Sequence, residues 1–437
     1  MTQYSKRVLI LMLSLLAILS IAKSFYYTEK FGGTDLRCRI VGSRLLLTDK
    51  SPYFYHWHVG DDVRYLDPND EPNRIVNGNV VTPALLLLNK PLSLLSYQYI
   101  RILWTVILYT LFGLSLYFIW KVNEAEGDVF GPLAIILLGF MTSDSWFNNA
   151  ERGQTYVLYA FIFSFSYFIY HSKSRYNHLL AGAIAGVSIW VRPLFVLMNI
   201  PFLLQRNFKW LLGSAVGFIL GLFVFFIPLK ATWVDYNNAM KHYELEELRK
   251  ETYIPASHLI TKPKYVEGVS NLTDYKDGFA SAGMSNFQHS FRVMGLEVHA
   301  PALIAAFAFV IVICSLVFLK QKRSRQFDTN DLFLFGFLLY ILSELFLVGG
   351  RGGYNNIQWI FPTFIMLIFL RKNIIAVAVI LSGIAFMNGW PFLFPHQSAV
   401  GEAIMFYVLI DYVFIRKLTA DRYDGKNVGN LNSQLSH

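Results

Sequence analysis

Charged residues are scarce in this sequence: Asp, Glu, Lys and Arg make up only 15% of its 437 residues, against about 25% in a typical soluble domain. Hydrophobic residues make up 54%, and the mean hydropathy is +0.41. This balance excludes a water-soluble enzyme. It also excludes intrinsic disorder, whose signature is low hydrophobicity. We therefore predict a polytopic membrane protein.

Cysteine is scarce as well. Cys38 lies in a polar segment and Cys314 in an apolar run, so the sequence predicts neither a disulfide framework nor a cysteine-type metal site. His56 and His58 lack a third ligand at a recognisable spacing, and a surface loop is the simpler interpretation. Solenoid repeats and a glycine-rich nucleotide-binding loop are also missing from the sequence. We expect no cofactor and no metal ion.

The formal net charge of +9 would suggest a nucleic-acid partner if the basic residues shared one soluble face. They lie instead in short patches between apolar runs, as the positive-inside rule predicts for cytoplasmic loops. We therefore expect no nucleic-acid partner.

Apolar runs approach the ~20 residues that a membrane-spanning helix needs. They occur at about 7–27, 100–120, 129–142, 154–171, 210–229, 299–319, 331–348, 356–370, 374–390 and 399–415. A further apolar stretch, 179–205, contains Arg192-Pro193 near its middle, where proline breaks or kinks a helix. This stretch is either one kinked span or a hairpin of two short helices.

The basic residues that flank the runs distinguish these two alternatives. A hairpin returns Arg206 and Lys209 to the side of Lys173, and it leaves the basic cluster 320–325 in the cytoplasm. A single crossing would place that cluster outside. The hairpin predicts an all-α fold of about twelve membrane segments, with both termini in the cytoplasm.

Two large segments, about 28–99 and 230–298, are then expected outside the membrane. Any chemistry belongs there, because the cytoplasmic loops are too short to form a domain. The first run has features of a signal peptide, but its removal would upset the parity of the spans, so we interpret it as an uncleaved anchor. Residues 1–420 then form one integral domain of the plasma (inner) membrane, and 421–437 form a polar cytoplasmic tail.

Asp35 carries the clearest chemical signal. It follows the first run closely and comes just after Gly32-Gly33, which permit a tight bend. Thr34 or Asp35 could simply cap the helix that follows. The alternative is a general base at the membrane boundary, where a carboxylate reaches both a polar acceptor and the head group of a lipid-linked substrate.

Arginines kept outside the membrane run against the positive-inside rule and suggest a phosphate or carboxylate partner. Arg152 lies beside Glu151 in a short outer loop, 142–154, for which an ordinary solvated connection is the alternative. Arg351 lies between paired glycines, which let the backbone approach a ligand or form only a flexible turn. Arg192 lies at the hairpin tip, where an unpaired charge costs roughly 2.5–3.5 kcal/mol. Its alternative is a side chain that snorkels to the interface.

Three further residues belong to the same outer region. Glu344 lies inside an apolar run and is expected to be paired with an arginine or protonated. His289 and Arg292 close the long outer segment beside the next span, so they could reach the same cavity.

The order of these features resembles glycosyltransferase family 87, which is typified by polyprenyl-phosphate-mannose-dependent α-mannosyltransferases. The resemblance rests on Asp35 after the first span, Ser51-Pro52-Tyr53, Thr82-Pro83-Ala84-Leu85, Gly153-Gln154, and the stretch from Ala181 to Gly186 that leads into Arg192-Pro193. Its motifs cover about residues 1–230, and the remainder is similar only in topology. The chain departs from the family at Leu36, where an aromatic residue is usual, and at Arg192, where lysine is frequent.

The resemblance implies a GT-C fold. It also implies transfer of a mannose-like hexose from a polyprenyl-phosphate-linked donor to a lipid or glycan acceptor at the extracytoplasmic face, by an inverting displacement. Such a reaction needs a base for the acceptor hydroxyl and positive charge for the leaving phosphate. Asp35 is our candidate base. The candidate substrate-binding residues are Glu151, Arg152, Gln154, Arg192, His289, Arg292 and Arg351.

Two other functions are compatible with the same residues. A lipid-linked glycan flippase or transporter without catalysis would also hold charges within the membrane and use broken helices near its site. An outer-face ligase that transfers a whole lipid-linked glycan is the second.

Overall fold

Every regular element in the described part of the chain is helical, as the composition and the apolar runs predict. The computed structural model describes residues 3–48, 50–67, 70, 74–127, 129–247, 287, 291, 294, 296, 298–323, 327–347, 351–389, 393 and 397–415. The helices are α1 (Gln3–Phe31), α2 (Thr34–Leu45), α3 (Pro83–Ser93), α4 (Tyr97–Val122), α5 (Phe130–Met141), α6 (Asp144–Arg152), α7 (Tyr156–Tyr170), α8 (Asn177–Val191), α9 (Asn199–Leu204), α10 (Phe208–Gly221), α11 (Lys230–Glu247), α13 (Ala300–Lys322), α14 (Thr329–Leu347), α15 (Ile360–Leu370), α16 (Ile374–Met387) and α17 (Gln397–Ile410). Short 3₁₀ helices η1 (Val63–Tyr65), η3 (Pro193–Met198) and η8 (Gly353–Trp359) complete the parts used below.

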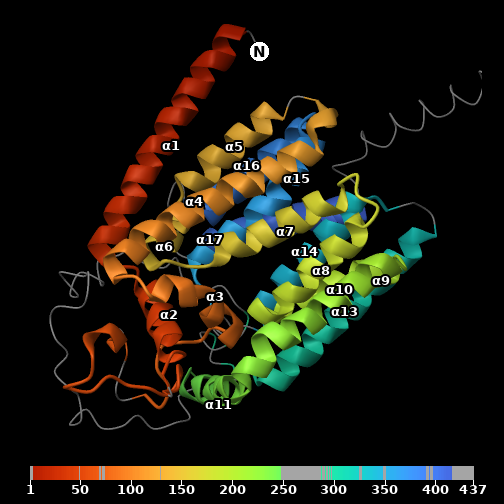
Figure 1. The fold of residues 1–437 in the computed structure, drawn as a ribbon. Coiled ribbons are helices and arrows are strands. Elements are labelled where there is room, and N and C mark those ends of the chain that lie inside the picture. The colour runs from red at the N-terminus through yellow and green to blue at the C-terminus, as the bar shows by residue number, and fades with distance from the viewer. Residues whose placement is uncertain are drawn as a thin grey trace, which may run out of the picture.

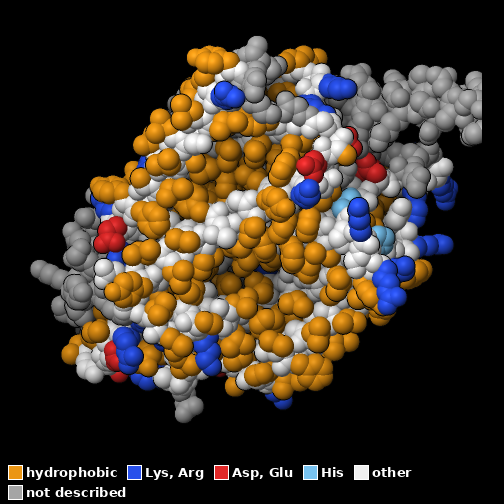
Figure 2. Space-filling view, turned by 45° about the horizontal axis from the view of Figure 1, so that its top comes forward, with side chains coloured by type: hydrophobic (Ala, Val, Ile, Leu, Met, Phe, Trp, Pro, Cys, Tyr) orange, Lys and Arg blue, Asp and Glu red, His pale blue; other side chains and the backbone are white. Residues whose placement is uncertain are grey.

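Six helices of the described chain are long and apolar enough to cross a membrane. They are Arg7–Lys30, Tyr97–Val122, Phe208–Tyr243, Ala300–Lys322, Thr329–Leu347 and Gln397–Ile415. Helices α5 and α6 make a seventh candidate if the pair, bent by 58°, counts as one span. Hydrophobic side chains also cover most of the face seen in Figure 2. A multi-pass membrane protein is thus supported, whereas about twelve segments and the GT-C fold are not confirmed, since several expected spans form helices of only 10–17 residues.

The α8–α10 pair shows where the chain reverses. A Cβ atom on Gly186 would lie 2.0 Å from the carbonyl oxygen of Ser214, and one on Gly182 would lie 2.2 Å from that of Trp210. The two backbones therefore touch, as small residues allow between membrane helices. Gly186 lies four residues after Gly182, and its partner Ser214 lies four residues after Trp210, so the two helices run in the same direction. Between them, η3 and α9 must therefore bring the chain back to the end where α8 began. This is the reversal at Arg192-Pro193 that the charge pattern predicts.

Helix α1 joins the bundle through a ridge of hydroxyls. Ser20, Ser24 and Thr28 are spaced by four residues and therefore share one helix face. Ser20 donates to the carbonyl of Met141 (2.6 Å), Ser24 lies 2.9 Å from the Tyr109 hydroxyl, and Thr28 donates to the carbonyl of Ala150 (3.4 Å). Large apolar residues on other faces of α1 are exposed, as a helix that contacts lipid requires.

Helix α2 organises the end of the molecule where α2, α3 and α11 gather (Figure 1). Buried Arg37 donates from Nε to the carbonyl of Leu66 (2.9 Å) and from Nη2 to that of Val63 (3.0 Å). Buried Arg44 donates to three carbonyls, those of Arg64, Ser93 and Leu95, over 2.8–3.1 Å. These arginines tie the irregular segments of the outer region to one short helix.

The hairpin makes a prediction about sidedness. We expect tags inserted after residues 60 and 260 to be extracytoplasmic, and tags at 325 and at the C-terminus to be cytoplasmic, because the return through α9 restores the parity of the spans. Accessibility of cysteine or epitope tags to impermeant reagents in intact cells measures this. If the tag at 260 is cytoplasmic and the tag at 325 is extracytoplasmic, the sidedness assigned to the hairpin is wrong.

Candidate active site

Asp35 does not cap α2, so the capping alternative is wrong. The cap position is taken by Gly33, in the left-handed conformation with φ 65°, and no side chain caps the helix. The Asp35 carboxylate instead receives a two-point contact from Arg152: Nε lies 2.6 Å from Oδ2 and Nη2 lies 3.2 Å from Oδ1. The Gln154 amide nitrogen also donates to Oδ2.

The segment that supplies Arg152 and Gln154 is helical, which corrects the prediction of a loop over 142–154. Ser143 caps α6 by accepting from the backbone N–H of Trp146 (3.0 Å). Gly153 ends the helix with φ 66°, and a Cβ there would lie 2.4 Å from Cβ of Leu36. The polar composition of α6 concealed a helix whose apolar side chains are buried against the bundle.

The Asp35 carboxylate remains available for chemistry. An ionised carboxylate offers about four lone-pair sites, and Arg152 and Gln154 use two on Oδ2 and one on Oδ1. One site on Oδ1 therefore has no partner within the described chain. The Asp35 side chain is 27% exposed, so a hydroxyl group can reach it.

Arg192 lies within the bundle at the break between α8 and η3. Its Nη2 donates to Oε1 of Glu344 at 2.7 Å, and its side chain is 20% exposed. Its Nε is buried and has no hydrogen-bond partner in the described part of the molecule. Arg192 thus combines a fixed guanidinium with donor capacity left over for an anion.

Glu344 is paired with arginine, which is one of its two expected states. Its side chain is fully buried and also accepts from Nε of Arg351 (3.3 Å), the Gln358 amide (3.0 Å) and the Tyr340 hydroxyl (3.2 Å). Arg351 directs both terminal nitrogens to Glu402. The structure therefore encloses Arg351 between two glutamates, with its side chain 0% exposed.

Tyrosine rings connect the two charged centres. The Arg152 guanidinium lies 5.5 Å from the ring centre of Tyr354, and the Arg192 guanidinium lies 5.5 Å from that of Tyr159. Tyr156 bridges them, with its ring centre 5.4 Å from each of those two rings. Arg152, which contacts Asp35, and Arg192 therefore lie along one continuous row of tyrosine rings.

Sequence reasoning located some of these residues and missed others. Glu151 lies on α6 with its side chain buried. His289 and Arg292 lie outside the described residues. Arg39, Glu402 and the three tyrosines were missed. Glu402 lies among mainly apolar residues, and its partner Arg351 is 51 residues away in the sequence. Only the energetic cost of leaving a buried charge unpaired could have indicated this pair.

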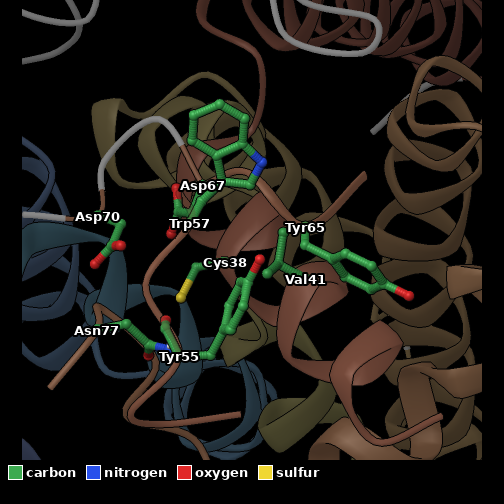
Figure 3. A pocket seen from close by; sticks show the side chains of 8 residues that line it. All are labelled: Cys38, Val41, Tyr55, Trp57, Tyr65, Asp67, Asp70 and Asn77. Carbon is green, nitrogen blue, oxygen red and sulfur yellow. The ribbon is translucent and has the colours of Figure 1, made fainter. Parts of the chain in front are cut away.

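A separate small pocket lies beside α2. Its lining is Cys38, Val41, Tyr55, Trp57, Tyr65, Asp67, Asp70 and Asn77 (Figure 3). The Tyr55 hydroxyl donates to Asp61 (2.7 Å), and Nδ1 of His56 lies 3.0 Å from Asp70. Burial raises the pKa of the Cys38 thiol well above its ordinary value, and the nearby Asp67 carboxylate raises it further. The thiol is therefore protonated at neutral pH.

Comparison with known protein families matches residues 81–348 to glycosyltransferase family 87. No curated protein and no solved structure matches the chain. The family match includes Arg152, Gln154, Arg192 and Glu344, whereas Asp35 precedes it.

The Arg351–Glu402 pair makes a prediction about stability. We expect Glu402→Ala to lower the free energy of unfolding by ~3–5 kcal/mol, because it leaves a buried guanidinium without its main acceptor. Thermal unfolding of the purified protein in detergent measures this. The control is Glu124→Ala, which breaks an ion pair with Lys121 whose side chains are 48% and 53% exposed, and we expect it to change little. Equal effects of the two variants would contradict the prediction.

Proposed function

The chain belongs to glycosyltransferase family 87, and on that premise we propose that it transfers a mannose-like hexose from a polyprenyl-phosphate-linked donor to a lipid or glycan acceptor. The reaction takes place at the extracytoplasmic face of the plasma membrane. The observation that carries the proposal is the state of Asp35: its carboxylate does not cap α2, accepts three hydrogen bonds from Arg152 and Gln154, and belongs to a side chain that is 27% exposed.

Asp35 acts as the general base. An acceptor hydroxyl donates its hydrogen bond to the open site on Oδ1, and Asp35 takes the proton as the hydroxyl oxygen forms its bond to the anomeric carbon. The bond from that carbon to the phosphate oxygen breaks in the same displacement, and its electron pair leaves with the polyprenyl phosphate. Attack opposite to the leaving group inverts the configuration, so a β-linked donor gives an α-linked product.

Arg192 binds the phosphate of the donor. Negative charge grows on that phosphate as the glycosidic bond breaks, and a guanidinium held in place stabilises it without reorganisation. Glu344 fixes one edge of the Arg192 guanidinium, and the side chain, which is 20% exposed, leaves other donors of the group to the ligand. Arg351, the Tyr340 hydroxyl and the Gln358 amide donate to Glu344 in turn, so Arg192 is preorganised.

Arg152 and Gln154 orient the base in this proposal. Both donate to Asp35, and so they fix the plane of its carboxylate. Arg351 supports Arg192 through the glutamate that the two arginines share. Glu151, His289 and Arg292 stay in the proposal as residues of the same outer region.

The role of Asp35 is tested by Asp35→Asn. We expect turnover to fall by a factor on the order of 10²–10⁴, the usual contribution of a general base, while donor affinity and abundance of the folded protein stay close to those of the wild type. Asp35→Glu should also be slow, because an added methylene displaces the carboxylate from the acceptor. The assay is hexose transfer from a polyprenyl-phosphate-linked donor by purified protein, with donor binding measured in parallel.

The outcome of that assay separates the functions. An Asp35→Asn protein that transfers hexose at the wild-type rate would remove Asp35 as the base, and Asp144 on α6 would become the next carboxylate to test. A wild-type protein that moves lipid-linked sugar across vesicles but forms no glycosidic bond would favour the transporter.

The role of Arg192 makes a separate prediction. We expect Arg192→Ala to weaken donor binding by a factor on the order of 10 to 100, since a charge-assisted hydrogen bond contributes about 1.5–3 kcal/mol. Arg192→Lys should retain part of the affinity. Lysine keeps the positive charge but cannot donate two parallel hydrogen bonds to the phosphate as a guanidinium can. Equilibrium binding of the donor measures both. Wild-type affinity in the alanine variant would exclude Arg192 from the phosphate site.

A further inference from the structure

Arg39 lies one helical turn after Asp35 on α2, and its guanidinium contacts the segment Gly153-Gln154, which also contacts Asp35. Its Nη1 donates to the carbonyl of Gly153 at 2.7 Å, and its Nη2 donates to Oε1 of Gln154 at 2.5 Å. The Arg39 residue is only 7% exposed. It does not touch the Asp35 carboxylate, and Gln154 stands between them.

The chemistry of the three side chains allows only one order. Arginine can only donate hydrogen bonds, and an ionised carboxylate can only accept them. Gln154 carries one group of each kind, so its oxygen must face Arg39 and its nitrogen must face Asp35. Arg39 therefore determines which end of the amide meets the carboxylate.

We propose that Arg39 is a positioning residue for Asp35, acting through Gln154. The inference rests on the proposed role of Asp35 as the base. The two ends of the amide are nearly equal in size, so without Arg39 the group can turn over and present its oxygen to Oδ2. Oδ2 then loses a donor and faces an acceptor oxygen, so Arg152 alone is left to hold the carboxylate.

Arg37 provides a matched control on the same helix. It is also buried, but it donates to the carbonyls of Leu66 and Val63 and not to Gln154. Substitution of Arg37 therefore removes a buried arginine from α2 but leaves the hydrogen bonds of the Gln154 amide in place.

The test is a double-mutant cycle with Arg39→Met and Gln154→Ala in the full-length protein. We expect each single variant to lower kcat by up to a factor on the order of 10², the cost of a misplaced catalytic group, with the KM for the donor unchanged. In the double variant we expect no further loss, because both changes break the same link. Arg39→Lys should recover part of kcat, since it restores one donor. In the control cycle, the effects of Arg37→Met and Gln154→Ala should multiply.

A second readout requires no turnover. The rate at which a water-soluble carbodiimide couples glycine ethyl ester to Asp35, followed by peptide mass spectrometry, reports how firmly the carboxylate is held. We expect about a tenfold rise in Arg39→Met and in Gln154→Ala, corresponding to a lost hydrogen bond to a charged group, and the same value in the double variant. Arg37→Met should leave the rate unchanged.

Two results would overturn the inference: multiplicative effects of Arg39→Met and Gln154→Ala in both readouts, or a coupling rate in Arg39→Met equal to that of the wild type. Failure of the proposed function is a different result, since it would show as absence of hexose transfer by the wild type while the coupling rates still report on Arg39. If Arg39→Met does not fold, Arg39→Lys takes its place in the cycle.

Discussion

A guanidinium buried away from water must find acceptors for donors that point in several directions, because it carries five N–H groups and does not lose its charge. This requirement shapes the end of the molecule around α2. Arg37 and Arg44 on α2 gather carbonyls from segments with little regular structure of their own. Arg351 brings Glu344 and Glu402 together from different helices. Asp35, Gln154, Arg192 and Arg351 are each held by a contact of this kind.

The sequence predicts those parts of the fold that follow from local pattern and solvent. Composition indicates a membrane protein, and the basic residues around 179–205 indicate a chain that returns after Arg192-Pro193. The energetics of a buried carboxylate indicate that Glu344 is either paired with an arginine or protonated, and the structure shows the pair. The family is also recognisable, because the motifs near Asp35, Gly153-Gln154 and Arg192 occur in the right order relative to the apolar runs.

Other features depend on contacts between distant residues and leave no local signal. Helix α6 has polar residues on both sides of Trp146 and Phe147, so its composition is that of a loop, and only packing against its neighbours shows which side chains are buried. Gly33 takes the cap position of α2 because a positive φ is easily adopted by glycine, which releases Asp35 for Arg152. The Arg39–Gln154 contact joins residues 115 apart in sequence. The number of spans stays a prediction for a related reason: several of the expected spans form helices of only 10–17 residues, and length alone does not show whether such a helix crosses the bilayer.

The single open lone pair on Asp35 has a consequence for the product. Arg152 and Gln154 occupy the other directions of approach, so a hydroxyl can donate to the carboxylate along one direction only. An acceptor sugar has several hydroxyls of similar acidity, and under the proposed mechanism only the one that meets this direction is deprotonated. Regioselectivity of the new linkage would then be encoded by the hydrogen bonds around the base, and an acceptor could vary in size or anchor without any change in the position at which it is glycosylated.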